Sequence, residues 1–107
     1  MVQAGSRIRS IPAEEIAYFF FTEKDVFLCT REGRSYPTEY SLDKLETLVN
    51  PDAYFRINRK MLVSFSSITK IVSLSKSRLK LELHPPHNEE VLVSFNKTPA
   101  FREWLDR

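Results

Sequence analysis

A short polar turn in the middle of the chain carries residue types suited to recognising nucleic acid. The triplet Asn58-Arg59-Lys60 lies between the apolar anchors Ile57 and Met61, which would hold it in a fixed geometry. Asparagine and arginine side chains are shaped for bidentate contacts with the edges of adenine and guanine. The triplet therefore suggests a surface that docks on a regular partner. The simpler alternative is an ordinary basic turn on a β domain.

The distribution of charge points to the same class of partner. Residues 1–53 carry six basic and nine acidic side chains, whereas residues 54–107 carry ten basic and five acidic ones. Within residues 54–80 there are seven basic side chains and no acidic one. Such a segment raises the local potential and favours a polyanion, although a basic face can also be only a solvated surface.

The residues that could support other chemistry are few. The single cysteine, Cys29, excludes an internal disulfide and a cysteine-built zinc site, and its strand-like surroundings predict a buried core thiol. His84 and His87 flank a Pro-Pro pair with no obvious third ligand, so we expect no metal site.

Catalysis also finds little support in the sequence. The paired carboxylates Glu14-Glu15 and Glu89-Glu90 are adjacent in sequence and would point to opposite faces of a strand. Two glycines are too few for a phosphate-binding loop or a dinucleotide fingerprint. We therefore expect neither an enzyme nor a bound cofactor.

The elements that must position the polar turn are mostly strands. Alternation is clearest at residues 78–84, where leucines at 79, 81 and 83 alternate with polar residues. Strands are predicted at residues 7–12, 15–21, 26–30, a return strand ending near 37, 54–57, 62–65, 68–74, 78–84 and 91–95. Short connections at 32–34 and 75–77 predict hairpins, so the fold class is mostly β with antiparallel strands.

Two short helices complete the predicted fold. Ser41 is a plausible N-cap for a helix over residues 42–49, which ends at Asn50-Pro51. A second helix is predicted from Pro99 to Asp106. The length of 107 residues suits one domain, residues 7–107, preceded by a loose leader over residues 1–6. Neither a membrane-spanning segment nor a secretion signal is visible, so a reducing, cytoplasmic setting is the expectation.

The order of these pieces resembles a known family. A Ser-Leu-x-x-Leu-Glu helix at residues 41–46 precedes Phe-Arg-Ile-Asn-Arg-Lys-x-Leu-Val-Ser at residues 55–64. An Ile-x-x-Ile pair, a Leu-x-Leu hairpin, a Val-x-Val-Ser strand and a terminal helix follow. Over residues 7–107 the chain resembles the LytTR DNA-binding domain of bacterial transcriptional regulators.

The resemblance implies an elongated, compact β domain that reads DNA with loops in successive major grooves. The loops fall here at residues 23–26, 58–60 and 94–97. The residues expected to bind DNA are Arg59, Lys60 and Asn96 as base readers, Asn58 as reader or positioner, and Lys24, Lys76, Arg78 and Lys97 as phosphate contacts. Family members often carry arginine where this chain has Phe95, and histidine where it has Asn58, so the binding surface is transferred without a base code.

The resemblance also implies the partners. Double-stranded DNA with repeated sites is the expected ligand, and RNA polymerase is a further candidate. Typical members are output domains of two-component response regulators, with an N-terminal receiver that a histidine kinase phosphorylates. No receiver is present in these 107 residues, so the chain would be a fragment of a longer regulator or a stand-alone binder.

Two alternatives remain open at this point. One is a β domain that binds protein or ligand and has lost DNA binding. The other is a single-stranded RNA binder that uses the aromatic run at residues 18–21 as a stacking platform. In a strand, about half of that run must point inward, and no basic residues interleave it, which disfavours the second alternative.

Overall fold

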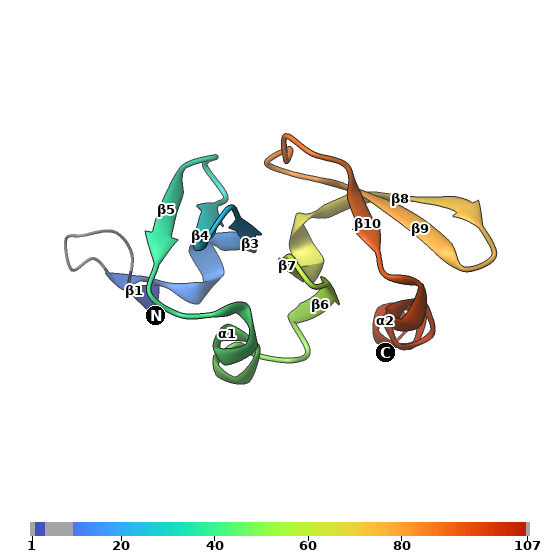
Figure 1. The fold of residues 1–107 in the computed structure, drawn as a ribbon, viewed down its shortest axis with the longest axis horizontal. Coiled ribbons are helices and arrows are strands. Elements are labelled where there is room, and N and C mark those ends of the chain that lie inside the picture. The colour runs from blue at the N-terminus through green and yellow to red at the C-terminus, as the bar shows by residue number, and fades with distance from the viewer. Residues whose placement is uncertain (1, 4–9, 107) are drawn as a thin grey trace.

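The apolar run at residues 16–21 forms the central strand of the larger sheet in this computed structural model, which describes residues 2–3 and 10–106 (Figure 1). The sheet is antiparallel throughout. Its strand order is β5 (Ser35–Thr38), β4 (Asp25–Thr30), β3 (Ile16–Thr22), β7 (Met61–Ser64) and β6 (Tyr54–Asn58). Strands β6 and β7 are neighbours in sequence and in space, so the turn that joins them lies at one end of the sheet.

A second sheet is built on the alternating leucines. Its order is β10 (Val91–Val93), β9 (Arg78–Leu83) and β8 (Ile68–Ser75). Leu79, Leu81 and Leu83 are buried, as their alternation predicts. The backbone N–H of Ser94 donates to the carbonyl oxygen of Ile57 at 2.8 Å, which joins the end of β10 to β6 of the larger sheet. With the two sheets joined in this way, the protein is elongated and measures 44 × 26 × 23 Å.

Two α-helices and three 3₁₀ turns connect the strands. Helix α1 (Leu42–Leu48) is capped by Ser41, whose Oγ accepts from the Lys44 N–H at 3.1 Å. Helix α2 (Thr98–Leu105) carries Pro99 in its first turn. The 3₁₀ turns are η1 (Ala13–Glu15), η2 (Phe65–Ser67) and η3 (Phe95–Lys97). None of the described helices is long and apolar enough to cross a membrane.

The core lies in two clusters on either side of β3. Phe19 belongs to the cluster under α1, together with Leu45 and Leu62. Tyr18 belongs to the other, which includes the β9 leucines and Phe101 of α2. Because successive side chains of one strand enter both clusters, β3 fixes the two ends of the domain relative to each other.

The predicted fold class is confirmed: the domain is mostly β and antiparallel, with two short helices. The predicted strands at 62–65, 78–84 and 91–95 extend one or two residues too far. Phe65 and Phe95 are aromatic residues of a type common in strands, but each belongs to a 3₁₀ turn. In the first turn Ser64 Oγ accepts from the Ser67 N–H, and in the second the Ser94 carbonyl oxygen accepts from the Lys97 N–H. The predicted strand at 78–84 ends at Leu83.

The remaining boundaries differ by one residue or lie near the N-terminus, where residues 4–9 are outside the described part of the chain. Helix α1 ends at Leu48 instead of 49, and α2 covers 98–105 instead of 99–106. Of the predicted strand at 7–12, the structure describes Ser10–Ile11 as β2, which pairs with β1 (Val2–Gln3). Residues 7–9, and the rest of the predicted leader at 1–6, lie outside the described residues.

Candidate nucleic-acid interface

The β6–β7 turn is held by the side chain of Asn58. Its Oδ1 accepts from the Lys60 N–H at 2.7 Å, and its Nδ2 donates to the Leu92 carbonyl oxygen at 2.7 Å. Ile57 is fully buried and Met61 nearly so, which fixes the strands on both sides. Both polar atoms of Asn58 are thus engaged within the protein, so of the two predicted roles the structure favours positioning.

Arg56 braces the same turn through hydrogen bonds to its backbone. Its Nε donates to the Asn58 carbonyl oxygen at 2.8 Å, and its Nη2 donates to the Arg59 carbonyl oxygen at 2.8 Å. Nη1 lies 2.8 Å from Asp43 Oδ1 and 3.0 Å from Glu46 Oε1, both on α1. The two carboxylates neutralise the guanidinium, so Arg56 acts as a scaffold for the turn.

Sequence reasoning counted Arg56 only as one basic residue among seven. A usable signal was present, since Asp43 and Glu46 stand three residues apart and therefore share one face of the predicted helix. An arginine two residues before a turn and an acidic helix face make a plausible pair. Their proximity, however, depends on how α1 packs against β6.

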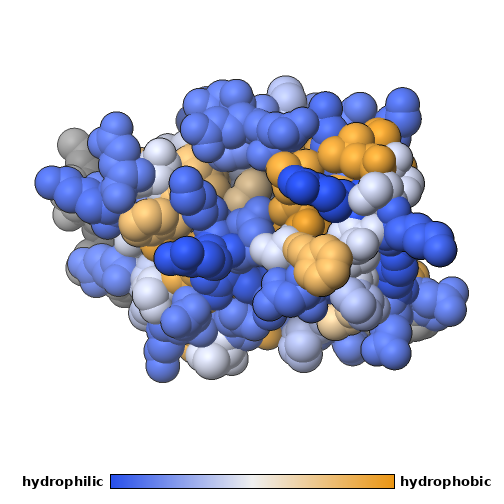
Figure 2. Space-filling model, turned by 45° about the vertical axis from the view of Figure 1, so that its right-hand side comes forward, coloured by the Kyte–Doolittle hydropathy of each residue, from blue (hydrophilic) through white to orange (hydrophobic). Residues whose placement is uncertain are grey.

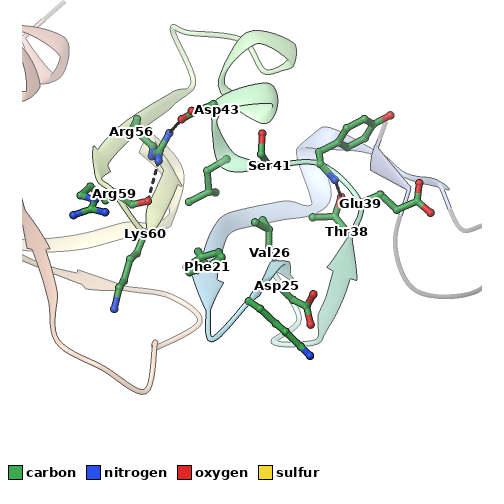
Figure 3. A pocket seen from close by; sticks show the side chains of 13 residues that line it. Phe21, Asp25, Val26, Thr38, Glu39, Ser41, Asp43, Arg56, Arg59 and Lys60 are labelled. Atoms are coloured by element: carbon green, nitrogen blue, oxygen red, sulfur yellow. Dashed lines mark hydrogen bonds and ion pairs between the residues drawn. The ribbon is translucent and has the colours of Figure 1, made fainter.

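Arg59 and Lys60 are the exposed tips of the braced turn. In the part of the chain that the structure describes, neither side chain has a polar partner. Figure 3 shows them leaving the turn in different directions. Two unpaired cations on a fixed backbone give a surface whose charge is available to an external ligand.

An open groove of about 900 Å³ separates this turn from the β3–β4 turn. Arg59 and Lys60 line one side, and Asp25 and Glu39 line the groove as well (Figure 3). Lys24 is also part of the lining. Lys24 is exposed, and its neighbours in the sequence are the acidic residues Glu23 and Asp25. The first predicted loop is therefore beside the second, with a net charge less favourable to a polyanion than that of the second.

The third predicted loop lies on the other side of the braced turn. Asn58, Arg59, Ser94, Asn96 and Lys97 all line one hollow of about 250 Å³. Asn96 is exposed, and its amide has no polar partner in the described part of the chain. The structure thus brings Asn96 and Lys97 together with Arg59.

The tip of the β8–β9 hairpin carries two further residues that the sequence analysis predicted to bind DNA, Lys76 and Arg78. Ser75 and Arg78 face each other across the hairpin, and Lys76 is exposed at its tip. The Thr98 hydroxyl donates to the Ser77 carbonyl oxygen at 3.0 Å, which places the tip beside the start of α2. Lys24 lies in the β3–β4 turn of the larger sheet and Lys76 at the tip of the β8–β9 hairpin of the smaller one, and the 900 Å³ groove that contains Lys24 does not include Lys76. The eight predicted residues therefore do not line a single pocket.

The other candidate groups have structural roles. Tyr18 and Phe19 are buried and Phe20 is partly buried, so Phe21 is the one exposed ring of the aromatic run. A single exposed ring disfavours a stacking platform for single-stranded RNA, which needs several rings. Cys29 is a buried free thiol, as predicted. His87 packs edge-on against Phe20, with ring centroids 4.9 Å apart, and burial lowers its pKa while Glu89 opposes that shift. Among the described residues no three metal-ligating side chains are grouped to hold an ion.

Comparison with known proteins identifies the family and a similar fold. A family model described as the LytTr DNA-binding domain matches residues 6–106. Among solved structures, the chain is similar to a LytTr DNA-binding domain from Bacillus cereus, described as part of a methyl-accepting/DNA response regulator. That likeness has a TM-score of 0.84 at 23% identity and covers 99% of this chain and 94% of the other. No curated protein matches the chain.

Proposed function

The chain belongs to the LytTR DNA-binding domain family, and from that premise we propose that it binds double-stranded DNA at specific sequences and regulates transcription. The observation that carries the proposal is the braced β6–β7 turn. It presents Arg59 and Lys60 on a fixed backbone, next to Asn96 and Lys97 of a second loop. A fixed turn loses little conformational entropy on binding, which favours selective contacts with base edges.

The dimensions of the domain suit a duplex. One turn of B-DNA is about 34 Å long, and its major groove is about 12 Å wide. The domain is 44 Å long, so loops near its two ends can reach successive major grooves on one face. A tight turn between two strands is narrow enough to enter such a groove.

We assign the contacts by chemistry. Arg59 and Asn96 read base edges, since a guanidinium or an amide can make paired hydrogen bonds that distinguish bases. Lys60 enters the major groove of the DNA beside Arg59. Lys24, Lys76, Arg78 and Lys97 bind phosphates, which add affinity without sequence information. Asn58 and Arg56 do not touch DNA in this assignment but hold the turn in place.

The proposal extends to the cellular role. The similar Bacillus cereus protein is described as a response regulator. We propose that this chain is the output domain of a bacterial two-component regulator in the cytoplasm, coupled to a receiver and a histidine kinase. Repeated DNA sites and contact with RNA polymerase fit that role. Expressing the gene with its full upstream frame, and testing phosphotransfer, would examine it.

The test of DNA binding is selection of duplexes from a random pool followed by a salt titration. If four to six phosphates are neutralised, log affinity for the selected duplex falls against log salt with a slope of about −4 to −5. An affinity insensitive to salt between dilute and physiological buffer contradicts the proposal, as does failure to enrich any sequence.

A second candidate function follows from the groove of about 900 Å³, whose lining mixes Arg59 and Lys60 with Asp25 and Glu39. Mixed charge suits a protein or small polar ligand better than a polyanion. The salt titration separates the two functions, because only DNA binding gives a slope of several units.

A further inference from the structure

Phe95 is the most exposed large apolar side chain of the described chain. Its exposed fraction is 71%, compared with 51% for Leu74 and 47% for Phe65. Figure 2 shows a mostly hydrophilic face on which hydrophobic side chains reach the surface in separate patches. Single exposed apolar residues are common and often have no role. What distinguishes Phe95 is its place in the loop at residues 94–97, which is one of the loops assigned to DNA.

The backbone that carries Phe95 is fixed on both sides. The preceding Ser94 donates its N–H to the Ile57 carbonyl oxygen at 2.8 Å, and its own carbonyl accepts from Lys97 N at 2.9 Å and Thr98 N at 3.1 Å. Thr98 is 3% exposed and anchors the other end of the turn. The exposed ring is therefore presented by an ordered turn and has only two side-chain torsions to restrict on binding.

The surroundings of this turn match the edge of a base pair better than an apolar protein surface. The residues on either side of Phe95 in the chain, Ser94 and Asn96, line a hollow with Lys97 and Arg59. Asp43 and Glu46 line the same hollow, where both form ion pairs with Arg56. Hydrogen-bond donors and unpaired cations are therefore close to the ring along the chain. Such donors would be left unpaired against an apolar partner, which would cost free energy. Against DNA they meet phosphate oxygens and base acceptors, and the ring needs one apolar group among them.

We propose that Phe95 contacts the C5 methyl group of a thymine in the major groove, an inference that rests on the proposed DNA binding. The thymine methyl is the apolar group on the major-groove edges of the four bases, and a phenyl ring packs against it without hydrogen bonding. Phe95 thereby adds a preference for a 5-methylpyrimidine to the hydrogen-bonding preferences of Arg59 and Asn96.

The test replaces thymine by deoxyuridine, one position at a time, in the selected duplex. This change removes the methyl group and keeps the base pair and the phosphates. We expect one or two positions at which the wild-type domain loses about fourfold in affinity, the value of one buried methyl group. Phe95→Ala binds the thymine duplex about as weakly as wild type binds the deoxyuridine duplex, and it no longer distinguishes the two.

Leu74→Ala is the matched control, because Leu74 is an exposed apolar residue on β8. It keeps the full thymine preference. Both substitutions remove exposed side chains, and a circular dichroism spectrum confirms that each variant is folded.

Every outcome decides the proposal. Sequence-selective, salt-dependent binding with no thymine preference in the wild type, or a preference that survives Phe95→Ala, overturns the role of Phe95 and leaves DNA binding intact. A selected site without thymine does the same. Absence of any selective duplex binding overturns the proposed function, and the role of Phe95 with it.

Discussion

The β6–β7 turn and the β8–β9 hairpin tip have similar sequences but different support. Each connects adjacent antiparallel strands and carries two basic residues, Arg59 and Lys60 in the first, Lys76 and Arg78 in the second. The first is held by five hydrogen bonds or ion pairs of Arg56 and Asn58 to their neighbours within 2.8 Å, and by a further ion pair from Arg56 to Glu46. In the second, the Ser73 hydroxyl donates to the Ser75 carbonyl, and the tip accepts two hydrogen bonds from α2.

The flanking residues differ in the same sense. Ile57 and Met61 are both buried beside the first turn, whereas beside the second Leu79 is buried and Leu74 is half exposed. Base reading requires donors in a fixed place, whereas attraction to phosphate tolerates movement. We therefore propose that the braced turn provides specificity and the hairpin tip provides general affinity.

Removal of the brace should have the largest effect. In Arg56→Met the turn loses both hydrogen bonds to its carbonyl oxygens, so Arg59 and Lys60 no longer hold their positions, and the carboxylates of Asp43 and Glu46 lose their partner. Because each well-placed base contact is worth about 1–3 kcal/mol, we expect affinity for the selected duplex to fall about 100-fold. Fluorescence anisotropy on selected and random duplexes measures the loss.

For this variant the random duplex is the control, since phosphate contacts elsewhere remain. A comparable loss on both duplexes would mean that Arg56 supports the whole domain and not the turn. Urea unfolding identifies that case, because the free energy of unfolding would then fall by much more than the ~1.5–3 kcal/mol of a charged hydrogen bond.

Asn58→Ala should have a smaller effect on the same turn. It removes the hydrogen bonds to Leu92 and Lys60 but leaves the Arg56 brace, so we expect about tenfold weaker binding to the selected duplex and a loss of ~1–2 kcal/mol in unfolding free energy. Asn96→Ala is the matched control for stability, since the exposed Asn96 amide lacks a polar partner among the described residues. Stability unchanged in Asn58→Ala and lowered in Asn96→Ala would reverse the assigned roles.

The smallest expected effect is on the pH dependence of stability, and it arises from His87, in the loop between β9 and β10. His87 lines a hollow with Arg59 and Lys60, and it packs against Tyr18 and Phe20. Burial lowers its pKa in the folded protein, so the unfolded chain binds a proton more readily. The contribution of His87 to stability is therefore complete above its unfolded pKa of about 6.5 and is lost as pH falls below that value.

His87→Phe removes this titration. We expect the decrease in unfolding free energy between about pH 7.5 and about pH 5.5 to be smaller in the variant than in the wild type. Since other groups titrate in both proteins, only the difference between the two pH dependences is informative. Identical pH dependences would show that His87 is protonated as easily in the folded as in the unfolded chain.

Elements with strong local signals could be predicted from the sequence. The alternating leucines of β9 and the Ser41 cap of α1 depend on contacts within a few residues, and both are observed. The boundaries at Phe65 and Phe95 could not, because an aromatic residue after a strand looks like its continuation. There, the preceding serines start 3₁₀ turns through short-range hydrogen bonds.

The position of the polar turn at residues 58–60 could be predicted from the sequence, but the side-chain bonds that hold it could not. The triplet at 58–60 stands out by its polar residues between apolar anchors. The bond from Asn58 to Leu92 spans 34 residues, and that from Arg56 to Asp43 spans 13, so neither follows from a local pattern. The roles of Asn58 and Arg56 as supports depend on how β6 meets β10 and α1 in the folded protein.

The most direct test of base reading by the braced turn compares Arg59→Ala with Lys76→Ala on the selected and the random duplex. Arg59→Ala should cost about 1–3 kcal/mol on the selected duplex and much less on the random one. Lys76→Ala should weaken both by similar small factors and flatten the salt slope by about one unit. If the two duplexes lose affinity equally in Arg59→Ala, Arg59 is a phosphate contact, and Asn96 becomes the better candidate for the base reader.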